Sequence, residues 1–229
     1  MEVKKDIGSL VLYKNNQLIA FNKPNGLTVQ ADKTQDISLH SLGEIYCKSK
    51  LHLVHRIDRP ASGVVLFAKN TKALATLNEA FQQRKIEKTY LAVVGKIPAD
   101  QKGTLEHFLK KQPRGNKSVV SSADEKNAKL ATLSYRLLGS TERYHLLEVQ
   151  LYSGRHHQIR AQLAAIGSPI KGDNKYGFRR MNRDRSIHLH AWKLRFTHPT
   201  TQQQETVVAP LPDEVLWNAF KAPIAALNE

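Results

Sequence analysis

The sequence predicts a single α+β domain built on a mixed, mostly antiparallel β-sheet flanked by helices and loops. Apolar segments of strand length outnumber segments with helical periodicity. Several of these segments follow one another across short turns, as antiparallel hairpins do. No linker or low-complexity tract divides the 229 residues, so we expect one domain over residues 1–229.

The N-terminal part begins with two short strands in LVLYKNNQLIAFNKP (10–24), which turn at KNNQ. SGVVLFAK (62–69) is a continuous apolar run of strand length, so we expect burial on both of its faces. A helix should follow from Asn70, because asparagine favours the N-cap position. One face of this helix would carry Ala73, Leu74, Leu77, Ala80 and Phe81.

The central part contains further strand and helix signals. KTYLAVVGKI (88–97) is a predicted strand, and LATLSYRLLG (130–139) should pair with YHLLEVQLY (144–152) as an antiparallel hairpin. HHQIRAQLAAIG (156–167) predicts a short helix with Gly167 just past its end.

The C-terminal part is predicted to contain one long strand and a last helix. IHLHAWKLRFTHP (187–199) changes its alternation near Ala191 and Trp192, as a β-bulge would cause. Pro212 and Asp213 open an amphipathic helix whose apolar residues are Val215, Leu216, Ala219 and Phe220.

Cysteine content and hydropathy constrain the cellular environment. The single cysteine, Cys47, excludes an internal disulfide and any CxxC metal knuckle, and it fits a reducing compartment. The N-terminus has no apolar signal segment, and no apolar run approaches the ~18 residues of a membrane span. We therefore expect a cytoplasmic protein without a membrane partner.

The charge distribution points to nucleic acid. The chain has 35 Lys and Arg against 20 Asp and Glu, a net charge of +15. Residues 171–195 contain eight Lys and Arg against two Asp. KKQPRGNK (110–117) forms a second basic segment, which we expect to be a loop because Pro and Gly interrupt it. Clustered cations suit a phosphate backbone, although a generic basic surface is the alternative. The candidate RNA-binding residues in these segments are Lys110, Lys111, Arg114, Arg179, Arg180 and Arg183.

Several other chemistries lack their motifs. The histidines of HLVH (52–55), His156–His157 and HLH (188–190) have no HExxH pattern and no carboxylate to complete a metal site. Ser62 lies outside any GxSxG elbow, and neither a Walker motif nor GxGxxG occurs. We expect neither a metal nor a nucleotide cofactor.

The segment HRIDRPASG (55–63) places the carboxylate of Asp58 between Arg56 and Arg59, with apolar runs on both sides. Taken alone, this pattern favours a structural ion pair. However, the segment resembles the HRLDxxTSG block of the RluA-type pseudouridine synthases.

Three further blocks carry the same resemblance, in the same order. NKPNGLTVQ (22–30) is similar to KPxGLxV, and EKTYLAVV (87–94) is similar to the K-x-Y-x-A strand. SGRHHQIRAQLAAIGSPIKGDNKYG (153–177) is similar to GRTHQIRxHLxxxGxPIxGDxxYG. The blocks cover most of residues 20–198. The departures are Ile57 for Leu, Ala61 for Thr and His156 for Thr.

The resemblance implies a pseudouridine synthase domain that detaches a uridine base in RNA, turns it and rejoins it through carbon, without metal or cofactor. It implies that Asp58 is the catalytic carboxylate, that Arg160 is the cation paired with it, and that Tyr90 stacks on the target base. Arg56 would fill the space that the flipped base leaves, or would bind phosphate instead. Arg155 would orient backbone or phosphate.

The resemblance also limits the substrate. No N-terminal S4 domain is expected, and relatives without it act on tRNA or on large-subunit rRNA; the motifs look closest to the subgroup that modifies the T-stem of tRNA. We expect a monomer. The competing hypothesis is a non-catalytic RNA-binding or ribosome-assembly protein that retains the fold. A hydrolase of RNA or nucleosides is a third possibility, but the sequence shows no metal site or water-activating pair for it.

Overall fold

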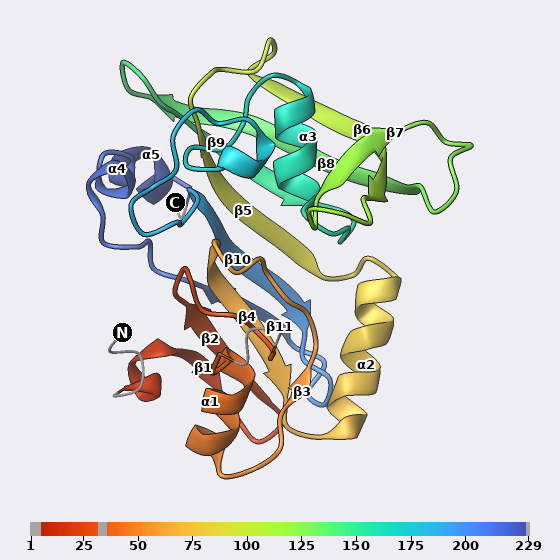
Figure 1. Cartoon of the computed structure of the whole chain (residues 1–229). Coiled ribbons are helices and arrows are strands. Elements are labelled where there is room, and N and C mark those ends of the chain that lie inside the picture. Colours follow the sequence, from red (N-terminus) through yellow and green to blue (C-terminus); the bar gives the residue numbers. More distant parts are fainter. Residues whose placement is uncertain (1–5, 32–35, 228–229) are drawn as a thin grey trace. The chain divides into compact units, whose positions relative to one another are not determined.

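The computed structural model describes residues 6–31 and 36–227. The chain forms two compact units, each built from two segments (Figure 1). Unit 1 comprises Met1–Lys88 and Ala191–Leu211, and unit 2 comprises Thr89–His190 and Pro212–Glu229. Each unit contains a mostly antiparallel sheet with short helices, so the predicted α+β class is confirmed.

The sheet of unit 1 has the strand order β1-β2-β4-β10, with β3 paired to β4 and β11 paired to β10. Its strands are β1 (Val11–Lys14), β2 (Leu18–Lys23), β3 (His52–Leu53), β4 (Ser62–Ala68), β10 (Leu189–Thr197) and β11 (Gln204–Val208). The hairpin predicted at KNNQ is confirmed, and β1 and β2 pair antiparallel. Asn15 forms the turn, because its side-chain oxygen accepts hydrogen bonds from the backbone N–H groups of Gln17 and Leu18.

Strand β4 is buried along its whole length, as its apolar run predicts. Gly63 at its start has a positive φ of 114° and lies against the backbone of Ala191, where an added Cβ would come within 2.2 Å of the carbonyl oxygen. Only glycine permits this approach. The alternation of apolar and polar residues in β10 changes within 189–192, where every residue is buried. The bulge expected there stays a prediction.

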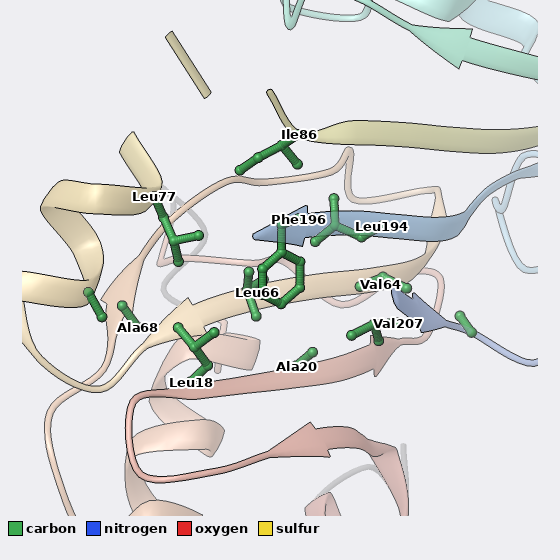
Figure 2. Close-up of a cluster of buried hydrophobic side chains, with 12 residues drawn as sticks. Leu18, Ala20, Val64, Leu66, Ala68, Leu77, Ile86, Leu194, Phe196 and Val207 are labelled. Carbon is green, nitrogen blue, oxygen red and sulfur yellow. The ribbon is translucent and has the colours of Figure 1, made fainter. Parts of the chain in front are cut away.

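Helix α2 (Thr71–Gln82) covers one face of this sheet. The Asn70 side chain accepts a hydrogen bond from the Ala73 N–H and caps the helix, as predicted. Ala73 and Leu77 pack against Leu66 and Phe196 in a cluster that spans β2, β4, β10 and β11 (Figure 2). The predicted apolar face of the helix is therefore its core face.

Helix α1 (Leu39–Cys47) was not predicted. Side chains alternate between the two faces of a strand, so Phe21 of β2 and Phe67 of β4 lie outside the cluster under α2. The centres of their rings are 6.0 Å apart. Gly43 of α1 lies against Phe21, where an added Cβ would be 3.1 Å from the ring. Glycine is a poor helix former, which hid this helix from the sequence pattern, yet its lack of a side chain is what allows the close packing.

The sheet of unit 2 has the strand order β5-β9-β8-β6-β7, and all four neighbouring pairs run antiparallel. Its strands are β5 (Glu87–Val94, whose first two residues belong to unit 1), β6 (Lys102–Lys111), β7 (Ser118–Ser121), β8 (Lys129–Ser140) and β9 (His145–Leu151). The predicted hairpin of β8 and β9 is confirmed. Helix α3 (Gln158–Ala165) packs Ala161 against Leu109 and Ala131 of the sheet.

Two predicted helices differ in extent from the structure. Helix α3 begins at Gln158, and His157 before it has φ 52°, so His156 lies outside the helix. The prediction of one continuous helix after Pro212 is wrong. Two short helices replace it, α4 (Val215–Asn218) and α5 (Lys221–Ala225).

The break between α4 and α5 has a local cause. In one continuous helix, the ring of Pro223 would clash with the carbonyl of Ala219, four residues earlier. The buried residues are accordingly Trp217, Phe220 and Ile224, whereas Val215 is 84% exposed. No helix in the described ranges is long and apolar enough to cross a membrane.

Candidate active site

Asp58 lies in an irregular segment between β3 and β4 and is half-buried. Its neighbours in the chain fix the position of its backbone. The Asp58 carbonyl accepts a hydrogen bond from the Ala61 N–H at 3.1 Å, and the Arg59 carbonyl accepts one from the Gly26 N–H at 2.9 Å. The carboxylate is therefore carried by a backbone that is anchored on both sides.

Arg59, the residue after Asp58, strengthens this anchor. Its Nε donates to the Gly26 carbonyl at 2.9 Å, and its terminal nitrogen forms an ion pair with Asp36 at 2.7 Å. Sequence reasoning alone favoured a structural ion pair in which Asp58 was the acid. In the structure, Arg59 pairs with the carboxylate of Asp36.

Lys23 is the residue of this region that sequence reasoning missed. It is fully buried, and its Nζ donates to the carbonyls of Pro24 and Leu27, both at 2.8 Å, and of Arg59 at 3.2 Å. Burial lowers the pKa of Lys23 to about 7, while the negative charge of Asp58 acts in the opposite direction. Lys23 thus cross-links the NKPNGL and HRIDRPASG segments and interacts electrostatically with Asp58.

Arg160 lies on α3 in unit 2 and is buried, with 4% of its surface exposed. Its guanidinium donates two hydrogen bonds to the carboxylate of Asp173, at 2.6 and 2.9 Å. Such a bidentate pair fixes the side chain strongly. The predicted pairing of Arg160 with Asp58 joins residues of different units, and it stays a prediction.

Tyr176 connects this ion pair to the basic hairpin of β6 and β7. The Arg160 guanidinium lies 5.0 Å from the centre of its ring, and its hydroxyl accepts a hydrogen bond from the Ser118 N–H at 2.8 Å. The same hydroxyl is 3.0 Å from Nδ1 of His157, and Nδ1 of His156 is 2.9 Å from the Ser118 hydroxyl. The two motifs GRHHQIR and GDNKYG and strand β7 therefore form one polar network.

Tyr90 and Arg155 also lie in unit 2. Tyr90 is buried on β5, where it pairs in register with Val149 of β9. Arg155 is exposed, and its Nε donates to the Leu130 carbonyl at 3.0 Å. Its predicted role toward RNA stays a prediction.

The predicted RNA-binding cations occupy two loops and a strand end. Lys110 and Lys111 belong to the end of β6, not to the loop, and Lys110 pairs with Glu125 at 2.6 Å. The loop begins at Gln112 and is held by Lys175, which donates to the carbonyls of Gly115 and Asn116. In unit 2 the exposed cations of this set are Lys111, Arg114, Arg179, Arg180 and Arg183. Arg56, in unit 1, is exposed as well.

The histidine clusters have packing partners. His55 accepts a hydrogen bond from the Leu66 N–H, and burial lowers its pKa to about 3, so it is neutral. His188 contacts Glu214 at 3.0 Å and stacks on Trp217. Over the part of the chain that the structure describes, no group of three or more His, Cys, Asp or Glu could hold a metal ion.

Solved structures share this fold. Human RNA pseudouridylate synthase domain containing 4 superposes with a TM-score of 0.75 and 25% identity, covering 98% of this chain and 95% of its own. Human RNA pseudouridylate synthase domain containing 1 gives a TM-score of 0.73 at 21% identity, covering 94% of each chain. The chain thus has the fold of the RNA pseudouridylate synthases, a class of enzymes that act on RNA.

Sequence comparison leads to the same class. Residues 17–165 match the family described as RNA pseudouridylate synthase. A tRNA pseudouridine synthase C of Haemophilus ducreyi is 34% identical over 92% of this chain and 95% of its own length. A ribosomal large subunit pseudouridine synthase C of Rickettsia bellii is 34% identical over 91% of this chain and 70% of its own length. The chain belongs to the RNA pseudouridylate synthase family and is of the RluA type.

Proposed function

We propose that this chain converts a uridine of tRNA into pseudouridine and that Asp58 is its catalytic carboxylate. The observation that carries the assignment is the anchoring of the Asp58 segment by Lys23 and Arg59. Lys23 donates to three carbonyls, one of them that of Arg59, and Arg59 itself is held by Gly26 and Asp36. A half-buried carboxylate on a fixed backbone is preorganised to act on a bound ribose or base.

The reaction is an isomerisation, so its atoms balance without a co-reactant. The bond from the ribose to N1 of uracil breaks, a bond from the ribose to C5 forms, C5 loses its proton and N1 gains one. Asp58 would serve as nucleophile or base, and Tyr90 would stack on the base and take part in proton transfer. Arg160 would hold the Asp58 carboxylate ionised.

The target base must leave its stack before it reaches Asp58, at a cost of a few kcal/mol. Arg56 is exposed two residues before Asp58, with Ile57 between them in the core. We propose that the planar Arg56 guanidinium fills the space vacated by the flipped base. Contact with a phosphate is the other role that its exposure permits.

The choice of RNA rests on the relatives. The Haemophilus ducreyi protein is named for tRNA, and the sequence motifs resemble the subgroup acting on the T-stem. Large-subunit rRNA is the second candidate, because the Rickettsia bellii protein of equal identity is named for it. Cations clustered in 110–117 and 171–195 suit either RNA.

Pseudouridine mapping in RNA from cells with and without this gene tests the proposal. We expect one tRNA position to lose its pseudouridine in the deletion strain and to regain it with the wild-type gene but not with Asp58→Asn. Loss of an rRNA position instead would assign the second candidate. Restoration by Asp58→Asn would favour a non-catalytic RNA-binding or assembly role.

Three organisational expectations belong to the same proposal. The two compact units would act together as one catalytic domain, the protein would function as a monomer, and it would work in the cytoplasm, where tRNA and ribosomes are found. Sedimentation of the purified protein with and without tRNA tests the monomer, since a dimer would double the sedimenting mass.

A further inference from the structure

Unit 2 contains a groove at the C-terminal end of β5, and among its lining residues only Arg179 was predicted to bind RNA. Its volume is about 380 Å³, and its lining includes Lys96, Arg143 and Arg179 together with the rings of Tyr144 and Phe178. These residues come from three stretches of chain that no sequence motif groups together. The lining contains no carboxylate.

Backbone pairing brings these segments together. Val94 at the end of β5 pairs with His145 on β9, next to the turn that carries Arg143 and Tyr144 (Figure 1). Val94 also forms an antiparallel bridge to Ile170, next to the Gly167–Pro169 part of the lining. The groove is therefore built on the sheet itself.

Phe178 is held in place as one wall of the groove. Its N–H donates to the Asp173 carbonyl at 3.0 Å, in the same turn whose carboxylate binds Arg160. Its ring lies against Gly95, where an added Cβ would come within 2.8 Å of it. Because Gly95 has no side chain, the ring can pack against the backbone at this position. Phe178 remains only half-buried there.

The three cations are exposed. Within the described residues, none of Lys96, Arg143 and Arg179 forms an ion pair with an acidic side chain. Unpaired cations beside half-buried aromatic rings are what single-stranded nucleic acid requires, because phosphates bind the cations and unstacked bases stack on the rings. A base inside a duplex offers no free face, so the fit is to unpaired nucleotides.

We propose that this groove binds a single-stranded segment of the RNA substrate, with phosphates on Lys96, Arg143 and Arg179 and a base against Tyr144 or Phe178. The inference rests on the proposed function for the identity of its ligand. It adds a binding subsite whose residues have no assigned part in the reaction. Arg179, already a predicted RNA-binding residue, gains a specific location.

The first test measures binding of a single-stranded oligouridylate by fluorescence anisotropy over a range of salt concentrations. The variant is Lys96→Gln/Arg143→Gln, and the matched control is Lys102→Gln/Lys126→Gln, two exposed lysines of unit 2 outside both basic segments. Each single-strand phosphate contact contributes a slope of about 0.7 in log affinity against log salt. We expect the slope to fall by about 1.4 in the groove variant and to stay unchanged in the control. Equal slopes in the two variants would overturn the inference.

The second test locates the base. Oligonucleotides carrying 4-thiouridine are cross-linked to the protein by light, and the modified peptides are identified by mass spectrometry. We expect cross-links at Tyr144 or Phe178, with those at position 178 lost in Phe178→Leu. Cross-links confined to other segments, or equal competition by polyglutamate of the same charge, would show that no base is bound in the groove.

Neither test depends on turnover. If the wild-type protein forms no pseudouridine in tRNA or rRNA but cross-links in the groove, the proposed function fails and the subsite stands. If it forms pseudouridine while the groove variant keeps the wild-type slope, the function stands and the subsite is refuted.

Discussion

Arg160 and Asp173 form a bidentate ion pair that is almost completely buried, with 4% and 1% of their surfaces exposed. The motifs predict that Arg160 also serves as the cation beside Asp58, which stays a prediction, whereas its contact with the aspartate 13 residues later is part of the structure. The pair joins α3 to the turn that carries Tyr176. Arg160 therefore holds α3 to this turn, whatever its role in the reaction.

Breaking this pair should destabilise the protein. In Asp173→Asn the buried guanidinium loses its counter-charge, and we expect a loss of ~3–5 kcal/mol in the free energy of unfolding. Urea unfolding measures this loss. The double variant Arg160→Met/Asp173→Leu removes both charges and should recover most of the stability. If the double variant is as unstable as the single one, the pair is not what holds α3 to the turn.

The same double variant separates stability from catalysis. We expect a folded protein with little or no pseudouridine formation, because no cation remains at position 160. Single-turnover assays on a tRNA transcript, at a temperature where the double variant is folded, measure this. Wild-type turnover would mean that Arg160 serves the fold alone.

Asp58→Asn should abolish pseudouridine formation while leaving folding and RNA affinity close to wild type, because an amide is isosteric with the carboxylate but cannot replace its charge. Turnover, tRNA binding and urea unfolding are measured on the same preparation. Clear residual turnover in this variant would refute the catalytic assignment.

Arg56→Met should impair base flipping and leave the acid limb of the pH–rate profile unmoved. Its defect should shrink on an RNA whose target uridine is already unpaired and unstacked, since less stacking must be replaced. Single-turnover rates on paired and unpaired substrates test this. An equal defect on both substrates, together with a shallower salt dependence of binding, would assign Arg56 to phosphate contact instead.

Lys23 should make stability depend on pH. Its pKa is about 7 in the folded protein against an ordinary value of 10.5, so the unfolded chain binds more protons between these pH values. Stability therefore rises with pH across this window, by up to about 1.4 kcal/mol per pH unit from this group. Lys23→Met should remove the part of this rise that comes from Lys23, whereas the exposed Lys102→Met should keep the whole rise.

Urea unfolding of the wild type and both variants at several pH values between 7 and 10 measures the effect. Lys88, whose pKa burial lowers to about 8, contributes in the same direction and remains in every variant, so the comparison is made between variants. Parallel stability curves for wild type and Lys23→Met would show that Lys23 keeps its ordinary titration when buried.

Local patterns in the sequence determined the elements whose residues carry their own signals. The Asn70 cap, the apolar run of β4 and the hairpin of β8 and β9 depend on residues close in the chain, so periodicity and turn chemistry predicted them. The family and its reaction likewise followed from motifs around Asp58, Tyr90 and Arg160. Where a local signal was weak or conflicting, as at Gly43 in α1 or Pro223 in α5, the prediction missed the helix or its break.

Tertiary structure alone decided how the polar side chains are used. Lys23 becomes an anchor because burial forces its ammonium to find three carbonyls, one of them 36 residues away. Asp173 becomes the partner of Arg160 because packing of α3 places the two charges together out of water. The groove gathers Lys96, Arg143 and Arg179 only because strand pairing at Val94 joins their segments. Sequence motifs identify such residues, but desolvation and long-range pairing, which no local pattern encodes, select their partners.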